Sequence, residues 1–353
     1  MPARLAREIL WKLCAIAVGL FAAGVLAAAF GNGAAPFYRA LVSGSFGSAG
    51  RAISTLAGIA PLLLAGLSVA VPFKGGLFNI GGEGQFLAGA LASVSVALAG
   101  GTLAAAAIVP LALLAGIGAG ALYASIAGWL KASRGVHEVI TTIMLNFIAF
   151  HATTYLVTSG PLCSPDGQPR TPIIAESARL PIVAGRGAYS LSLSIVLALV
   201  AVFAAWWFVE KSVTGFRIRA AGGNPLAASR KGISISRMTI VAMAAGGALG
   251  GLAGAGEVLG RQYSVSAGFS PGYGFDGIAV AFLAGGNIVA VGFSALLFAA
   301  IRSAGTALQL DAGLSPQMIY VIEALIVIAA AAPSAPKFFA RRRRPGVAKP
   351  VEA

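Results

Sequence analysis

The side chains that could bind a solute or carry a proton are few in this chain, and most of them lie in long apolar stretches. Six residues stand out: Asn79, Glu83, Gln85, Asn146, Asp276 and Glu323. Amides in such places can hydrogen-bond to a polar solute, and a lone carboxylic acid can relay protons. If these stretches cross a membrane, each residue is a candidate for function, because a polar group inside a bilayer is costly.

The motifs of nucleotide-binding and hydrolytic enzymes are missing from the sequence. There is no GxxxxGK[ST] loop to hold the phosphates of a nucleotide, and there is no GxSxG turn for a nucleophilic serine. The two histidines and the two cysteines lie too far apart in sequence to suggest a zinc cluster. We therefore expect no catalytic residue, no metal and no cofactor in this chain. Any ATP that drives it would be hydrolysed by another chain.

The composition places the candidate residues in membrane-spanning segments. Hydrophobic residues make up 58% of the chain and charged residues only 10%, with a mean hydropathy of +0.87. A soluble domain has about 25% charged residues, so a soluble protein is excluded. We expect one transmembrane domain, residues 1–333, and a basic cytoplasmic tail, residues 334–353, that is too charged to pack and is disordered.

Hydropathy divides the transmembrane domain into segments. Because a spanning helix needs about 20 mainly apolar residues, the sequence predicts an all-α polytopic membrane protein with about ten transmembrane helices. Their approximate ranges are 10–30, 53–72, 77–100, 103–130, 137–157, 189–209, 238–257, 276–285, 288–303 and 316–332. The seventh segment carries Gly246, Gly250 and Gly254, four residues apart, and this spacing permits close packing of helices.

The distribution of positive charge predicts the orientation in the membrane. With the N-terminus inside, 18 of the 25 Lys and Arg residues fall on the inner side, and seven, Arg302 among them, fall on the outer side. The positive-inside rule then places both termini in the cytoplasm, which requires an even number of spans. This asymmetry explains the net charge of +14 without a nucleic-acid partner. It also places Cys14 and Cys163 on opposite sides, so no disulfide is expected.

The third span begins in a glycine-rich stretch, FNIGGEGQ, where we expect the helix to be broken. A broken helix exposes free backbone groups, and a membrane protein tolerates it only in its interior or in a cavity wall. Glu83 lies in this stretch. It could line a pathway or brace a neighbouring helix, and the sequence leaves both roles open.

The same stretch matches a second one in the C-terminal half of the chain. FNIGGEGQFLAGALA, residues 78–92, aligns with FSPGYGFDGIAVAFL, residues 269–283, and the alignment pairs Gln85 with Asp276. In the predicted topology the first stretch begins at the inner face and the second at the outer face. This is what an inverted repeat requires, and such repeats place a translocation path at their interface.

The longest polar interruption of the apolar sequence is the basic loop, residues 210–237, which carries six Lys or Arg residues against one acid. Asn224-Pro225 suits a helix N-cap followed by proline at the first helical position, and Gly232 suits a helix end. We expect a short helix over residues 217–229, positioned to contact a partner. The alternative is a solvated loop that only sets the orientation.

Four blocks of sequence together resemble a known family. They are GLFNIGGEGQFLAGA (76–90), VHEVITTIMLNFIA (136–149), GFRIRAAGGNPLAASRKGI (215–233) and GYGFDGIAVAFLAGGN (272–287). In this order they resemble the membrane permease subunits of ABC importers for nucleosides and simple sugars, in the branch that works with basic-membrane-protein-type substrate-binding lipoproteins. The resemblance runs from about residue 50 to residue 333 and implies a permease fold like that of the vitamin B12 importer.

The resemblance also implies roles for particular residues and partners. In the basic loop it implies a coupling helix that docks on a cytoplasmic ATPase, and the matching residues are Arg217, Arg219, Gly223, Asn224, Ala227, Ala228 and Gly232. The expected pathway residues are Phe78, Asn79, Glu83, Gln85, Asn146 and Asp276. The implied partners are the ATPase, which holds ATP and Mg, a second related permease in a heterodimer, and a substrate-binding lipoprotein. The implied location is the bacterial cytoplasmic (inner) membrane.

Two other functions stay open at this stage. A proton-coupled secondary transporter of a small polar solute would use Glu83, Asp276 or Glu323 as its proton site and would need no partner. A structural membrane protein would carry no flux at all. The resemblance favours the importer subunit, with a purine nucleoside as its substrate.

Overall fold

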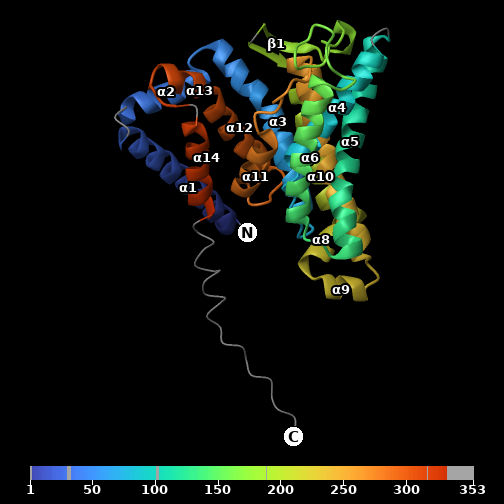
Figure 1. Ribbon diagram of the computed structural model, residues 1–353. Coiled ribbons are helices and arrows are strands. Elements are labelled where there is room, and N and C mark those ends of the chain that lie inside the picture. The colour runs from blue at the N-terminus through green and yellow to red at the C-terminus, as the bar shows by residue number, and fades with distance from the viewer. Residues whose placement is uncertain (1, 30–32, 101–102, 188, 316, 332–353) are drawn as a thin grey trace.

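Helices make up most of the computed structural model, which describes residues 2–29, 33–100, 103–187, 189–315 and 317–331 (Figure 1). The longer helices are α1 Pro2–Ala29, α3 Ala49–Phe73, α4 Gly82–Ala99, α5 Ala105–Arg134, α6 Glu138–Thr158, α7 Ser194–Lys211 and α10 Ile235–Glu257. The shorter ones are α2 Ala34–Phe46, α8 Val213–Gly223, α9 Pro225–Arg230, α11 Tyr273–Leu283, α12 Ala290–Ser303, α13 Gly305–Leu310 and α14 Met318–Ala331. The predicted tail lies outside the described residues.

Seven of the helical segments in the described part of the chain are long and apolar enough to cross a membrane, by length and composition. They are α3, α4, α5, α6, α7, α10 with the turn that follows it, and α12 with α13. Three shorter apolar helices lie in α1, α11 and α14. Each of the ten predicted segments therefore corresponds to a helix, and the chain is an all-α polytopic membrane protein. The number of helices that cross the membrane stays a prediction.

Two elements were not predicted from hydropathy. α2 occupies the polar stretch after the first segment, and Ser48 then caps the start of α3 by accepting a hydrogen bond from the Arg51 N–H. A two-stranded antiparallel hairpin, β1 Ile182–Arg186 and β2 Tyr189–Ser192, follows the long loop after α6. Because β2 uses residues assigned by hydropathy to the sixth span, α7 begins at Ser194 rather than at residue 189.

α3 lies at the centre of the molecule and packs against α7, α10, α11 and α12. Its residues from Ile59 to Pro72 are buried all round, including the small residues Gly66 and Ser68. A helix that is apolar on every side is typical of the core of a membrane protein. α3 thus provides the fixed scaffold against which the other helices are placed.

α10 packs closely against α3, α4 and α5 through its glycines. Gly246 faces Pro72 and the Ser68 carbonyl of α3, whereas Gly251 faces the Gly116 carbonyl of α5, and neither position leaves room for a Cβ atom. Gly254 faces α4 in the same way. The predicted close packing of this span is confirmed, and it follows from the absence of side chains on two faces of the helix.

The helices form two groups joined by α3, α11 and α12. α4, α5, α6 and α10 lie on one side, and α1, α2, α13 and α14 lie on the other (Figure 1). The basic loop, with α8 and α9, protrudes at one end of the molecule, and the β1–β2 hairpin lies at the opposite end (Figure 1). The first residues of α1 and the last of α14 point toward the end that carries α8 and α9 (Figure 1).

Candidate binding cavity and basic loop

The chain between α3 and α4 is extended rather than helical. Gly76 adopts a φ of +70°, which glycine accommodates without strain, and α4 begins only at Gly82. Asn146 of α6 bonds the freed backbone: it donates to the Ile80 carbonyl at 2.8 Å and accepts from the Gly84 N–H at 2.8 Å. The predicted break in the third span is confirmed, and a side chain from another helix satisfies its backbone groups.

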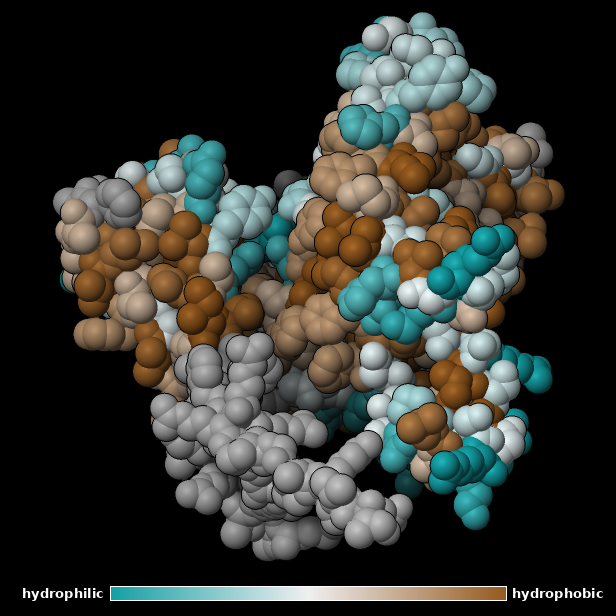
Figure 2. Space-filling view, turned by 60° about the horizontal axis from the view of Figure 1, so that its bottom comes forward, coloured by the Kyte–Doolittle hydropathy of each residue, from teal (hydrophilic) through white to brown (hydrophobic). Residues whose placement is uncertain are grey.

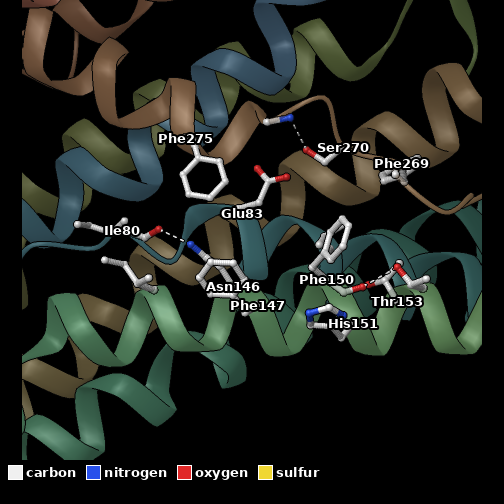
Figure 3. A pocket seen from close by; sticks show the side chains of 15 residues that line it. Ile80, Glu83, Asn146, Phe147, Phe150, His151, Thr153, Phe269, Ser270 and Phe275 are labelled. Carbon is white, nitrogen blue, oxygen red and sulfur yellow. Dashed lines mark hydrogen bonds between the residues drawn. The ribbon is translucent and has the colours of Figure 1, made fainter. Parts of the chain in front are cut away.

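A cavity of about 650 Å³ lies beside this break, between α4, α6 and the loop that precedes α11 (Figure 3). Most of its lining is apolar, and aromatic rings come from two sides. The labelled residues in Figure 3 are Ile80, Glu83, Asn146, Phe147, Phe150, His151, Thr153, Phe269, Ser270 and Phe275. A concave apolar cavity of this size with a few polar groups is the usual form of a small-molecule site.

Glu83 lies in the wall of this cavity and also joins two helix starts. Its Oε2 accepts a hydrogen bond from the Gly274 N–H, in the first turn of α11, at 2.8 Å. The two backbones are so close that a Cβ atom on Gly82 would lie 3.2 Å from the Gly274 carbonyl oxygen. A carboxylate is favourable at a helix N-terminus because it satisfies free N–H groups. Glu83 therefore braces the start of α11 and also lies in the cavity wall, and its role in a pathway stays a prediction.

The other acid near a helix start, Asp276, is not among the residues that line the cavity and belongs to an ion-pair cluster. Its Oδ2 lies 2.5 Å from a guanidinium nitrogen of Arg302, and Arg302 also lies 3.7 Å from Glu323 of α14. The guanidinium stacks over the ring of Tyr273 and donates to the Pro271 carbonyl. Among the described residues, no group of three or more acids, histidines and cysteines is placed to hold a metal ion.

The basic loop holds two helices rather than one, so the single helix predicted over residues 217–229 is wrong. α8 ends at Gly223 and α9 begins at Pro225, with Asn224 extended between them at φ −153° and ψ 95°. The break follows from Pro225, because the residue before a proline is disfavoured in the helical region. The predicted N-cap is confirmed: the Asn224 side chain accepts from the Ala227 N–H at 3.0 Å.

The surface of the basic loop combines positive charge with exposed apolar side chains. Leu226 is 77% exposed and Phe216 is 59% exposed, and Arg217 and Arg230 are exposed beside them. Figure 2, turned toward this end, shows apolar surface among hydrophilic side chains on the protruding loop. An apolar patch with a charged rim outside the spanning segments is typical of a protein–protein contact surface.

Comparison with known proteins identifies the family. The family model described as Branched-chain amino acid transport system / permease component matches residues 51–331. The guanosine ABC transporter permease protein NupP of Bacillus subtilis is 39% identical over 335 residues, which are 94% of this chain and 95% of NupP. This chain belongs to the ABC transporter permeases. This family consists of transport subunits rather than catalytic enzymes.

Two further relatives of this permease differ in their named substrates. The nucleoside ABC transporter permease protein NupB of Lactococcus lactis is 34% identical, over 91% of this chain and 90% of NupB. The glucose ABC transporter permease protein TsgB13 of Haloferax volcanii is 37% identical, over 76% of this chain and 72% of TsgB13. The chain also resembles NupQ, a guanosine ABC transporter permease protein of Bacillus subtilis, at 30% identity over 57% of its length. The resemblance to nucleoside and sugar permeases is confirmed.

Only two of the six predicted pathway residues of the permease line the cavity. Glu83 and Asn146 line the cavity, whereas Asn79 and Gln85 are buried behind it and hydrogen-bond to each other in both directions, at 2.8 and 3.0 Å. Asn79 also donates to the Ser68 carbonyl and accepts from the Gly81 N–H. These two amides brace the break.

The remaining two predicted pathway residues also lie outside the cavity. Phe78 is half-buried and packs its ring against Phe73 and Phe282. Asp276 belongs to the Arg302 cluster, although its neighbour Phe275 lines the cavity. The charge count placed Arg302 on the outer side, but its side chain lies between helices and is only 17% exposed. Arg302 also pairs with Glu323.

One wall of the cavity comes from a stripe on α6 that the sequence analysis did not identify. Phe147, Phe150, His151 and Thr154 line the cavity together with Asn146 (Figure 3). They recur at intervals of three and four residues, which places them on one face of a helix. The side chain of His151 is exposed in the cavity wall. Their helical spacing from Asn146 was the feature of the sequence that could have predicted this stripe.

The predicted coupling residues of the basic loop fall into two groups. Arg217, Gly223, Asn224, Ala227 and Gly232 are exposed. Ala228 is buried, and Arg219 is half-buried, with its guanidinium 3.3 Å from the Glu210 carboxylate. The first group can contact another protein directly, whereas the second holds the loop against the rest of the permease.

Proposed function

We propose that this permease is the membrane subunit of an ATP-driven importer and that the cavity between α4 and α6 is part of the path for a nucleoside. The observation that carries the proposal is the cavity itself, with aromatic walls and the polar groups of Glu83 and Asn146 beside a broken helix. Broken helices beside a cavity in the middle of a membrane protein are typical of substrate sites in transporters.

The packing of the helices supports an inverted repeat. α3 packs against α10 and α11, and α10 in turn packs against α3 and α4. In the alignment of residues 78–92 with 269–283, the first residue of α4 pairs with the first residue of α11, and Glu83 pairs with Gly274, to which it is hydrogen-bonded. Contact between equivalent positions is expected at a local two-fold axis. The proposal therefore includes ten spans with both termini in the cytoplasm of a bacterium, in its inner membrane.

The shape and lining of the cavity favour a nucleoside over a simple sugar. Phe147 and Phe150 come from α6, and Phe269 and Phe275 from the opposite wall. Aromatic faces stack on nucleobases with about 1–3 kcal/mol per base. The polar groups beside them, Glu83 and Asn146, can accept or donate hydrogen bonds. The named substrates of NupP and NupB, guanosine and nucleoside, agree with this lining.

The proposal requires three partners. A cytoplasmic ATPase, which binds ATP and Mg, docks on α8 and α9, where Leu226 and Phe216 are exposed beside positive charge. A second, related permease packs against α6, whose apolar side chains near the cavity, Met144 and Ile148, are more than half exposed. The resemblance of this chain to both NupP and NupQ supports a pair of related permeases. A substrate-binding lipoprotein delivers the solute at the end of the β1–β2 hairpin.

The mechanism that follows is alternating access driven from the basic loop. The lipoprotein releases the solute into the cavity, the ATPase pair closes on ATP, and the movement of α8 and α9 shifts the helices between outward-open and inward-open states. The cavity should hold its solute weakly, because a tight site slows release.

The test is purification of the tagged protein from gently solubilised membranes, followed by identification of the chains that copurify and by uptake assays in vesicles. Leu226→Glu places a charge on the exposed patch of α9, and Ile182→Glu, on the opposite end of the molecule, is a matched control because Ile182 is 51% exposed. We expect an ATPase to copurify with the wild type and with Ile182→Glu, but not with Leu226→Glu.

A different outcome would support the proton-coupled carrier. In that case no ATPase copurifies, uptake survives depletion of ATP, and uptake collapses when an uncoupler removes the proton gradient. Glu83, Asp276 and Glu323 would then be the residues to substitute first.

A further inference from the structure

The backbone of α8 lies directly against the turn that ends α3. Gly222 faces Gly75 and Gly76, and a Cβ atom on Gly222 would meet the Gly75 carbonyl carbon and would lie 2.7 Å from the Gly76 nitrogen. Real Cβ atoms essentially never approach other heavy atoms within 3.0 Å. No side chain fits at residue 222 unless α8 and the turn move apart, so this is a rigid contact between the basic loop and the start of the broken segment.

Charge and apolar packing hold the same two elements together. Glu210, at the end of α7, lies 3.3 Å from Lys74 of the turn and 3.3 Å from Arg219 of α8. Leu77, the first residue after the turn, packs with Ile218 and Ala221 of α8 in a small apolar cluster separate from the main core. A displacement of α8 therefore cannot leave residues 74–77 in place.

The broken segment then continues from this turn to the cavity. The Phe78 N–H donates to Glu138 Oε1 at 3.2 Å, and Glu138, 5% exposed in its side chain, is also paired with Lys131 of α5. Two residues later the chain reaches Ile80, which lines the cavity, and Glu83 follows at the start of α4. Residues 74–83 thus connect the basic loop to the cavity wall through one short stretch of chain.

We propose that residues 74–83 transmit the movement of the basic loop to the cavity, and that Gly222 and Glu138 are positioning residues for transport. This inference rests on the proposed function, in which an ATPase moves α8 and α9. Coupling between distant sites is carried by packed elements that both sites contact, and this segment is packed against α8 at one end and forms the cavity wall at the other. Gly222 fixes the distance between α8 and the turn, and Glu138 fixes the segment against α5 and α6.

The test follows the accessibility of residue 80 in the complete importer, reconstituted in lipid with its partners. Cys14→Ser and Cys163→Ser remove the natural thiols, Ile80→Cys introduces a label site, and the rate of maleimide labelling is measured without nucleotide and with ATP plus vanadate. In this background we expect ATP plus vanadate to change the labelling rate by about tenfold, within the usual range of coupling between sites. Adding Gly222→Ala should abolish this change while ATP hydrolysis continues.

Two controls separate positioning from a general loss of structure. Gly118→Ala, in α5, adds the same methyl group where nothing lies within 4 Å, and it should keep the response to nucleotide. Glu138→Gln keeps an oxygen that accepts from the Phe78 N–H and should keep the response, whereas Glu138→Ala removes that oxygen and should lose it. The Glu138 pair decides the question if Gly222→Ala fails to assemble.

The possible outcomes distinguish this inference from the function on which it rests. A nucleotide response in Gly222→Ala or in Glu138→Ala equal to that of the parent would overturn the inference and leave the importer intact. Failure of the unsubstituted permease to bind any ATPase would overturn the proposed function and the inference with it. Loss of uptake with continued ATP hydrolysis in Gly222→Ala, beside normal uptake in Gly118→Ala, supports both.

Discussion

α4 and α11 both begin in the interior of the molecule after glycine-rich turns, and each carries one acid in its first turn, Glu83 in α4 and Asp276 in α11. The two acids have different surroundings. Glu83 accepts a hydrogen bond from the Gly274 N–H, interacts with the Ser270 side chain and lies in the cavity wall, and no ion pair among the described residues includes it. Asp276 is held by Arg302, which also binds Glu323 and two tyrosine rings.

This difference separates a carboxylate that lies in a cavity wall from one that is held in an ion-pair cluster. The Arg302 cluster joins α11, α12 and α14, and its one cation is shared by two acids. Glu83 keeps one side of its carboxylate toward the cavity. An acid in a cavity wall that is in no ion pair among the described residues is therefore the better candidate for substrate contact, and an acid in an ion pair is the better candidate for stability.

The largest expected effect comes from removing the cation of the Arg302 cluster. Arg302→Ala leaves Asp276 and Glu323 buried without a counter-charge, and breaking a buried pair in this way costs about 3–5 kcal/mol. We expect a clear drop in the midpoint of thermal unfolding of the purified protein in detergent. Arg186→Ala, an exposed arginine in β1, is the control and should unfold near the wild-type temperature. Equal midpoints for the two variants would show that the cluster has no structural role.

The next largest effect concerns the amide pair behind the break. Asn79→Ala and Gln85→Ala each leave a buried partner unsatisfied, at a cost of about 1–3 kcal/mol. Because the two side chains bond to each other, the double variant should lose less stability than the sum of the single ones. A double-mutant cycle on thermal unfolding measures this difference. Strict additivity would contradict the pairing and would return both amides to the list of pathway candidates.

Substitution of the two acids compares their roles directly. Glu83→Gln keeps an acceptor for the Gly274 N–H but removes the charge from the cavity wall, and we expect KM for uptake to rise about tenfold, equivalent to about 1.4 kcal/mol. Asp276→Asn should instead reduce the amount of folded protein and leave KM of the remaining protein close to that of the wild type. Uptake of labelled nucleoside, normalised to folded protein, checks both. The reverse pattern would mean that the path runs through the Arg302 cluster.

The smallest expected effect is on the aromatic wall. Phe150→Leu keeps an apolar side chain of similar size but removes the ring, and an aromatic contact beyond area burial is worth about 0.5–1.5 kcal/mol. We expect KM for a nucleoside to rise a few-fold, whereas KM for a simple sugar, if any is transported, should change less. A Phe203→Leu variant, on the exposed face of α7, is the control. Equal effects of Phe150→Leu on both solutes would argue against stacking as the basis of selectivity.

Several features were predictable because they depend on neighbouring residues alone. The apolar segments follow from hydropathy, and the break before α4 follows from its glycine-rich stretch, because glycine weakens a helix and accommodates the positive φ of Gly76. The cap at Asn224 follows from its side chain and the proline after it. The division of the basic loop into α8 and α9 followed from the same proline, and the single helix predicted there neglected its effect on the preceding residue.

The tertiary structure alone decided which polar side chains meet in space. Asn79, Glu83 and Gln85 lie within seven residues, yet only Glu83 lines the cavity, because Asn79 bonds the Ser68 carbonyl of α3 and Gln85 bonds Asn79 and packs against Gly250 of α10. Arg302 of α12 pairs with Asp276 of α11 and Glu323 of α14. The count of Lys and Arg residues on each side of the membrane could not predict these pairs. Hydropathy and helix capping depend on residues that are close in sequence, so the sequence determined the helical segments. Which side chains pair between helices depends on the rotation and the packing distance of each helix. Rotation and packing distance are set only when the whole core assembles.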